Sequence, residues 1–191
     1  RELSQLYTVR GSCYSDLDDY QSAISDYKKA DEIFASKYPA SDGERVRLYA
    51  LLGGAEHRLN HYNESEHYYK LYTDGIKEIY GEHSLNYINA QIYLANAQGF
   101  AGHIEDGCGN YTSAVATLKK VIKKRLPYMN TAEREGFWSP LSSLLTYMTP
   151  YALKAELYQT EYTQTCYDAL LLSKAFLLDS ERSVYDIVQR D

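Results

Sequence analysis

Cysteine, proline and long apolar runs are all scarce in this 191-residue sequence. The three cysteines, Cys13, Cys108 and Cys166, lie far apart and form no CxxC pair. An odd number of scattered cysteines argues against a disulfide framework and favours free thiols in a reducing compartment. We expect Cys108, which sits in the Gly-rich stretch "EDGCGN", to lie in an exposed loop. No apolar run approaches the roughly 18 residues that a membrane-spanning helix needs.

Positive charge is also in short supply, with 20 Lys and Arg residues against 26 Asp and Glu residues and a net charge of −6. The longest basic cluster is "KKVIKKR" at 119–125. This balance argues against nucleic acid and anionic membranes as partners. The sequence begins at Arg1, directly in a helical pattern, which suggests a piece of a longer protein. We expect a cytoplasmic location.

Tryptophan and phenylalanine are rare, whereas tyrosine is abundant: there are 21 tyrosines, four phenylalanines and one tryptophan. A tyrosine ring is apolar, but its hydroxyl needs a partner or water. Tyrosine therefore suits half-buried contacts between thin layers better than a deep core. The composition favours an extended architecture with much surface.

Helical periodicity dominates the chain, and one pattern recurs. Large and small residues with steps of 3, 4 and 3 occur at Tyr20, Ala23, Tyr27 and Ala30. They recur at 62, 65, 69 and 72, and again at 111, 114, 118 and 121. A small residue precedes each set at Gly11, Gly53 and Ala95, at intervals of 53 − 11 = 42 and 95 − 53 = 42. The third set begins seven residues later than this period requires, which predicts an insertion or extended helices around "GHIEDGCG".

This pattern resembles the tetratricopeptide repeat (TPR), whose usual period is about 34 residues. The eight extra residues here correspond to about one added turn in each helix. The resemblance implies an all-α fold, an α–α superhelix of antiparallel helix pairs. We expect three TPR-like pairs over residues 1–129 and a divergent helical pair with a linker helix over 130–191. Helix-capping signals are expected at Asp18, Ser41, Ser84 and Asn130 with Glu133.

The final segment has a more specific resemblance. The stretches "EREGFWSPLSSLL" and "CYDALLLSKAFLLDSERSV" look like the region that follows TPR repeats in bacterial CHAT-domain proteins. In that family the region leads towards a caspase-like peptidase domain. The resemblance implies a helper region whose catalytic His and Cys would lie beyond Asp191, so the chain itself would be no enzyme. The matching residues are Tyr167, Ala169, Lys174, Leu177, Leu178, Ser180 and Arg182.

The stretch "EHRLNHYNESEHYYK", residues 56–70, holds three of the five histidines. A metal site would use His57 and His61, with His67 or Glu64 completing the ligands. No HExxH or CxxC pattern supports this, and the repeat places Asn60 and His61 in the turn between two helices. We expect a solvated turn, no metal and no cofactor, and we expect the helix dipole to favour protonated His57. A small metal-dependent hydrolase remains the alternative from another functional class.

The remaining function is recognition of a protein or peptide, since stacked helix pairs present a concave face lined by their first helices. On that face the repeat places Thr8, Ser12 and Ser15. The candidate groove residues further along are Arg47, Ala50, His57, Arg58, Asn89, Tyr93 and Asn96. We expect a partner bound there to control a downstream CHAT peptidase. Other readings are the sensor region of a signalling kinase or transcription regulator, and an oligomerisation module.

Overall fold

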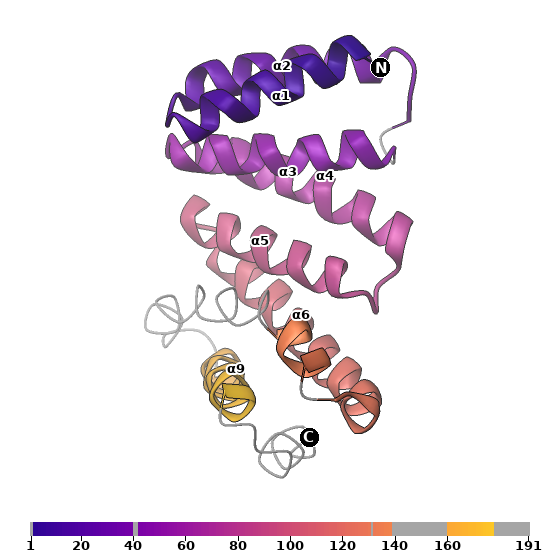
Figure 1. Ribbon diagram of the computed structural model, residues 1–191. Coiled ribbons are helices and arrows are strands. Elements are labelled where there is room, and N and C mark those ends of the chain that lie inside the picture. Colours follow the sequence, from indigo (N-terminus) through magenta and orange to yellow (C-terminus); the bar gives the residue numbers. More distant parts are fainter. Residues whose placement is uncertain (1, 40–41, 131, 139–159, 178–191) are drawn as a thin grey trace. The chain divides into compact units, whose positions relative to one another are not determined.

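The computed structural model describes residues 2–39, 42–130, 132–138 and 160–177, and every regular element in those ranges is helical. Contacts within the chain divide it into two units, Arg1–Glu82 and His83–Asp191. Each unit is described by itself below (Figure 1). In the described residues, no helix combines the length and the apolar character that crossing a bilayer requires.

Unit 1 consists of two helix pairs. The first is α1 (Glu2–Asp16) with α2 (Tyr20–Ala35), and the second is α3 (Gly43–Arg58) with α4 (Tyr62–Tyr80). The two helices of each pair pack together, and α2 also packs against α3. The buried core is formed by Ala23, Ile24, Tyr27, Ala30, Phe34, Leu48, Leu52 and Ala55.

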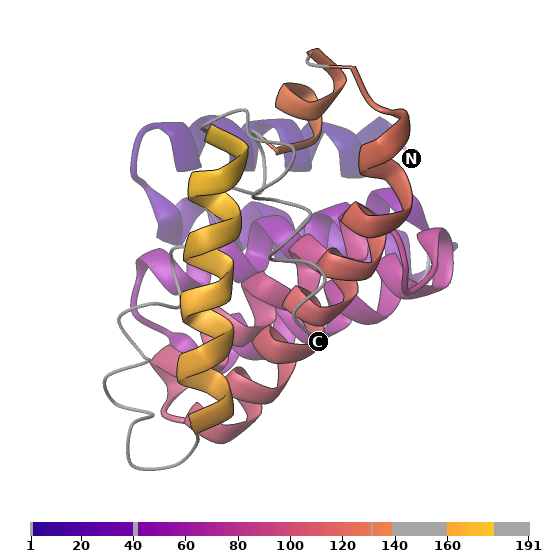
Figure 2. The same ribbon diagram turned by 90° about the horizontal axis from the view of Figure 1, so that it is seen from below.

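Unit 2 begins with the pair α5 (Leu85–Ala101) and α6 (Ile104–Arg125), followed by the 3-10 turn η1 (Leu126–Tyr128) and a helical stretch at 132–138. Helix α9 (Thr160–Leu177) packs beside α6 (Figure 2). The hydrophobic core of unit 2 joins these elements, and its residues include Tyr111, Leu118, Trp138, Tyr162 and Leu172. The domain boundary that we expect at residue 130 stays a prediction.

The turn inside each helix pair has the same conformation. Asp18, Asn60 and Gly102 all adopt positive φ, at 59°, 62° and 90°, and they are 60 − 18 = 42 and 102 − 60 = 42 residues apart. The next residue in each case donates its N–H back across the turn, from Asp19 to the carbonyl of Tyr14, from His61 to Glu56 and from His103 to Gln98, each at 2.9 Å. This is the bonding of a Schellman motif, which satisfies carbonyls at a helix end. The 42-residue spacing is therefore visible in the backbone.

These turns correct the sequence-based register of the third pair. Helix α6 begins at Ile104, which is 42 residues after Tyr62, and its Gly-rich start is helical. No residues are inserted between α5 and α6. Tyr111 is consequently the equivalent of Tyr69 and Tyr27, and not of Tyr62 and Tyr20.

The small residues of the first helices lie where two helices approach closely. A Cβ added to Gly11 would lie 2.7 Å from a ring carbon of Tyr27, and one added to Gly53 would lie 3.1 Å from the ring of Tyr69. In the third pair, a Cβ on Gly107 would lie 2.8 Å from the carbonyl oxygen of Ala95. In the first two pairs a tyrosine ring therefore rests on the bare backbone of the partner helix, whereas in the third pair the glycine lies on the second helix, against the backbone of α5.

Two of the four expected caps are displaced by one residue. The side chain that caps α2 is Asp19, which accepts from the N–H of Ser22 at 3.1 Å, whereas Asp18 forms the preceding turn. Asp42 caps α3 and accepts from the N–H of Glu44 at 3.0 Å, while Ser41 lies outside the described residues. The caps at Ser84 and at Asn130 are confirmed.

Cys108 is not in an exposed loop, contrary to the expectation. It lies within α6 and is 3% exposed, and burial raises the pKa of its thiol. Cys166 on α9 is also buried, and burial raises its pKa to about 11. Among the cysteines only Cys13 is exposed. The two buried thiols therefore act as small apolar core residues.

Tyrosine also contributes more to the deep core than its chemistry suggested. Tyr27 is 1% exposed, and Tyr111 and Tyr162 are fully buried. The rings of Tyr111 and Tyr162 meet edge to face with centroids 5.9 Å apart. Burial raises the pKa of both hydroxyls. The tyrosine-rich composition thus serves the helix interfaces themselves.

A buried ion pair joins α6 to α9. The Nζ of Lys119 lies 3.1 Å from Oδ2 of Asp168, and the two side chains are only 9% and 11% exposed. Gln164 donates to the other carboxylate oxygen at 2.9 Å. Lys119 is the one residue of the "KKVIKKR" stretch whose charge is satisfied inside the core.

Candidate partner-binding face of helix α3

One face of helix α3 carries a row of residues at steps of 3, 4 and 3, namely Arg47, Ala50, Gly54 and His57. Arg47 is exposed, and the other three are partly exposed. A Cβ added to Gly54 would meet only the hydroxyl of Tyr69, at 3.5 Å. The middle of this α3 face is thus low and open, with larger side chains at its two ends.

Arg47 has no carboxylate within ion-pair distance in the part of the chain that the structure describes. The pKa of the Tyr27 hydroxyl is raised overall, chiefly by burial, and the positive charge of Arg47 offsets part of that rise. The five N–H donors of Arg47 can therefore engage a carboxylate or backbone carbonyls of another molecule.

Arg58 is engaged within unit 1. Its Nε donates to the hydroxyl of Tyr20 at 3.0 Å, and its guanidinium lies over the same ring at 5.3 Å from the centroid. Asp18, which accepts a hydrogen bond from Tyr20, lies 3.7 Å from Nη2 of Arg58. These contacts tie the end of α3 to the turn between α1 and α2.

His57 is half-buried at the end of the α3 face, and its ring lies edge to face with Tyr62, 5.5 Å between centroids. Its pKa is lowered, first by burial and then by the charge of Arg58. Burial and the charge of Arg58 therefore favour the neutral imidazole, against the direction expected from the helix dipole.

The other two histidines of residues 56–70 contact separate partners. His61 Nδ1 lies 2.8 Å from Oε2 of Glu56, a carboxylate that is 3% exposed and also pairs with Lys28 at 3.2 Å. His67 lies against the ring of Tyr68. In the described ranges, no three His, Cys, Asp or Glu side chains converge in a way that could hold a metal ion.

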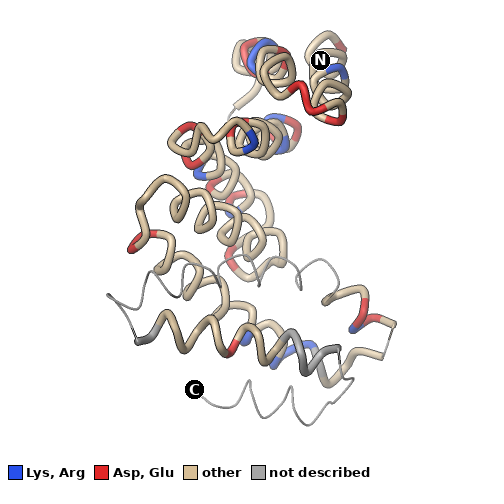
Figure 3. Tube along the Cα trace, turned by 90° about the vertical axis from the view of Figure 1, so that its left-hand side faces the viewer, with Lys and Arg blue, Asp and Glu red and all other residues tan. Residues whose placement is uncertain are grey.

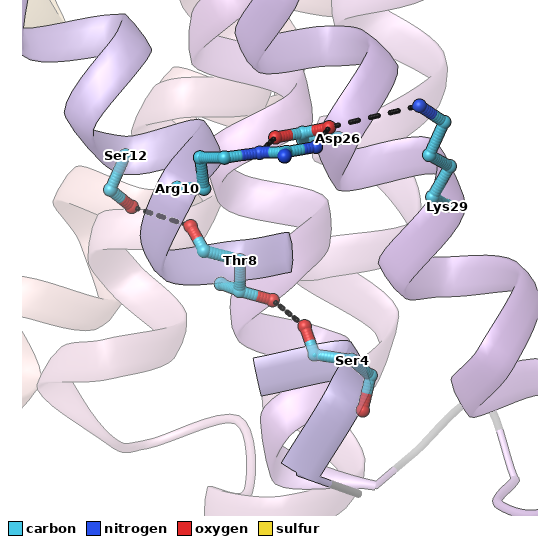
Figure 4. Close-up of polar contacts among 6 residues, drawn as sticks. All are labelled: Ser4, Thr8, Arg10, Ser12, Asp26 and Lys29. Carbon is cyan, nitrogen blue, oxygen red and sulfur yellow. Dashed lines mark hydrogen bonds and ion pairs between the residues drawn. The ribbon is translucent and has the colours of Figure 1, made fainter. Parts of the chain in front are cut away.

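Most of the hydroxyl side chains that we expect on the concave face of α1 donate hydrogen bonds to carbonyl groups of the same helix. Thr8 is buried and donates to the carbonyl of Ser4 at 3.0 Å, and Ser12 donates to the carbonyl of Thr8 at 3.1 Å (Figure 4). Tyr27 in turn donates to Ser12 at 3.3 Å. These small side chains keep the surface of α1 flat. Ser15 is half-buried.

The three candidates on α5 belong to unit 2. Asn89 and Asn96 are half-buried, and Tyr93 is 37% exposed. Their spacing of four and three residues places them on one face of α5. Within the described residues, the Oδ1 acceptor of Asn89 has no hydrogen-bond donor. That oxygen atom is buried, so this face presents the partly exposed ring of Tyr93 between two half-buried amide side chains.

Sequence reasoning missed the ion pair between Arg10 on α1 and Asp26 on α2. The guanidinium binds both carboxylate oxygens, at 2.5 and 2.7 Å, and Lys29 lies 3.9 Å away (Figure 4). Asp26 is 3% exposed. The signal was present, because Asp26 lies between Ala23, Tyr27 and Ala30 on the face of α2 that packs in the core.

The Asp26 pair predicts a pH dependence of stability. The hydrogen bonds from Arg10, and secondarily the charges of Arg10 and Lys29, hold the pKa of Asp26 below its ordinary value. Because the folded pKa is lowered, the stabilisation is present above the unfolded pKa and is lost as the pH falls through the folded value. We expect urea unfolding between about pH 6 and about pH 2 to show this loss. Asp26→Asn should remove that part of the dependence, whereas Glu105→Gln, at an exposed position in the first turn of α6, should leave it unchanged.

Comparison with known proteins agrees with this architecture. Residues 4–36, which span α1 and α2, match the tetratricopeptide repeat family model. The chain is similar to a solved structure from Podosopora anserina described as "kinesin light chain nearly identical TPR-like repeats", with a TM-score of 0.55 and 11% sequence identity over 98% of this chain and 97% of that one. No curated protein matches the sequence. The prediction of an all-α, TPR-like fold built from consecutive helix pairs is thus confirmed, with one tetratricopeptide repeat matched at residues 4–36.

Proposed function

We propose that this chain is a protein-interaction module that binds a polypeptide segment along the α3 face. The observation that carries the proposal is Arg47, an exposed guanidinium without an ion-pair partner in the described residues, at the end of a low surface formed by Ala50 and Gly54. TPR repeats generally bind proteins, and the fold is typical of scaffolds without catalytic activity.

The chemistry of the α3 face suits a peptide backbone. Small residues allow a main chain to approach the helix closely, and the Arg47 fork can bind a carboxylate or two carbonyl oxygens. At the other end, the imidazole of His57 can donate or accept a hydrogen bond. The α5 face with Asn89, Tyr93 and Asn96 supplies a second set of groups of the same kind, for the same class of partner.

Charge reversal at Arg47 tests this function. Peptides would be selected from a random displayed library on the 191-residue chain, and their affinities measured by fluorescence anisotropy. We expect Arg47→Glu to weaken the selected peptides about tenfold or more, because a charged contact becomes repulsive. Arg47→Lys should give a smaller loss, since lysine keeps the charge but lacks the fork.

Lys70→Glu is the matched control, because Lys70 is exposed on α4 and the substitution changes the net charge equally. Equal losses in Arg47→Glu and Lys70→Glu would indicate a general charge effect and contradict the proposed site. An Arg47→Glu variant that binds the selected peptides as tightly as the wild type would also contradict the proposed site.

The resemblance of the C-terminal segment supports a larger context. We propose that the parent is a cytoplasmic bacterial protein in which partner binding controls a downstream CHAT peptidase. Of the matching residues, Tyr167 is 55% exposed and Ala169 is buried on α9, while Leu178, Ser180 and Arg182 lie outside the described residues. The parent gene tests this directly, since a sequence after Asp191 without the His and Cys regions of a caspase-like domain would refute it.

A further inference from the structure

A hollow of about 1140 Å³ lies beside the C-terminal end of α6 in unit 2. Four cationic side chains of α6 line it, Lys120, Lys123, Lys124 and Arg125, and His83 lines it from the segment before α5. Figure 3 colours the lysines and arginines of the chain in blue. The hollow is thus strongly basic in a protein whose net charge is −6.

Within the described residues, Lys120, Lys124 and Arg125 have no ion-pair partner. Lys120 and Lys124 are four residues apart, so they are neighbours on the helix surface, and like charges at this spacing destabilise a helix. Lys123, Lys124 and Arg125 in the last turn offset the helix dipole. Lys120 lies a turn earlier, so the dipole does not account for it.

The lining contains one carboxylate, that of Glu133. Its side chain accepts a hydrogen bond from the N–H of Asn130 at 2.9 Å, while the Glu133 N–H donates to the Asn130 side chain at 3.0 Å. In this capping box the Glu133 carboxylate is engaged in capping the start of the 132–138 helix. Lys120, Lys124 and Arg125 therefore remain available to an external anion.

Apolar residues of the segment that follows α6 also line the hollow. They are Pro127, Tyr128 and Met129, and Tyr128 is 88% exposed. An exposed tyrosine ring offers a large rigid contact surface, and methionine adapts to different shapes. A ligand that fills the hollow would therefore combine negative charge with an apolar side chain.

We propose that this hollow binds an acidic peptide segment that carries an aromatic or aliphatic residue beside its carboxylates. The carboxylates pair with Lys120, Lys124 and Arg125, and the apolar side chain packs on Tyr128 and Met129. A nucleic acid fits less well, since its phosphates need a longer basic track than this one hollow. The site lies in unit 2, and the proposal does not rest on the α3 face of unit 1.

Fluorescence anisotropy on the 191-residue chain tests the hollow. The probe is a short labelled peptide with two Glu-Asp pairs around one phenylalanine, compared with the same peptide carrying Gln and Asn. We expect the acidic peptide to bind and to weaken as NaCl is raised, because the pairs are exposed. The double variant Lys120→Glu/Lys124→Glu should weaken it about tenfold or more.

The matched control is Lys37→Glu/Lys70→Glu, which changes the net charge equally at exposed positions of unit 1 and should bind as the wild type does. Tyr128→Ser should weaken the acidic peptide without changing its salt dependence. The proposal is overturned if the two double variants lose equal affinity, if the neutral peptide binds as tightly, or if a single-stranded oligonucleotide of equal charge binds more tightly. The last outcome would assign the hollow to nucleic acid.

Discussion

Lys119→Met should lower the free energy of unfolding by about 3 kcal/mol, because removing one partner of a buried ion pair leaves the other charge uncompensated. The remaining charge is that of Asp168, which is 8% exposed and, among the described residues, keeps the hydrogen bond from Gln164. Denaturant unfolding of the variant beside the wild type measures the difference. Methionine is close to lysine in length, so little volume is lost.

The neighbouring lysine provides the control for this substitution. Lys120→Met removes the same charge from an exposed position of α6 and should change stability by less than about 0.5 kcal/mol. The double variant Lys119→Met/Asp168→Leu should recover much of the loss, since an apolar pair of similar volume can replace a buried ion pair. A Lys119→Met variant as stable as Lys120→Met would show that Asp168 is solvated.

Alanine substitutions at Gly107 and Gly109, two residues apart on α6, should have opposite effects. A Cβ at position 107 would lie 2.8 Å from the backbone carbonyl oxygen of Ala95, which cannot move without shifting α5. We expect Gly107→Ala to destabilise the chain by about 1 to 3 kcal/mol through overpacking. A Cβ added to Gly109 would meet no atom within 4 Å in the described residues, apart from its chain neighbours and the backbone of its own helix. Gly109→Ala should therefore stabilise the chain by about 0.5 to 1 kcal/mol through helix propensity.

Thermal unfolding of the two variants and the wild type gives the comparison, with the same residue type introduced into the same helix. Helix propensity alone would make both variants more stable. A stabilised Gly107→Ala chain would therefore mean that α5 and α6 are packed less closely than described.

The helical fold class and the 42-residue spacing follow from the sequence, since a small residue is needed wherever a tyrosine ring lies on a helix backbone. Gly11 and Gly53 both fulfil this need. The register error in the third pair has a physical origin as well. Steps of 3, 4 and 3 recur along one helix face about every seven residues, which is close to two turns. The pattern beginning at Tyr111 therefore imitates the one beginning at Ile104.

The buried charges could not be predicted in the same way. Lys119 and Asp168 are 49 residues apart, and local sequence does not show which carboxylate meets which cation. For Arg58, the repeat indicated the face of the helix but not its contact with Tyr20 of the preceding pair. The stretch 56–70 illustrates the same limit, because His61 pairs with Glu56 only after the turn at Asn60 reverses the chain.

The single tryptophan of the chain, Trp138, is 4% exposed in the core of unit 2, and the aromatic reporters of unit 1 are tyrosines and one phenylalanine. Emission excited selectively from indole therefore monitors unit 2 alone, whereas circular dichroism monitors the helices of both units. Two transitions at different denaturant concentrations would mean that the units unfold separately, and coincident ones that they unfold together. The rarity of tryptophan thus gives the protein an intrinsic optical label on one of its two parts.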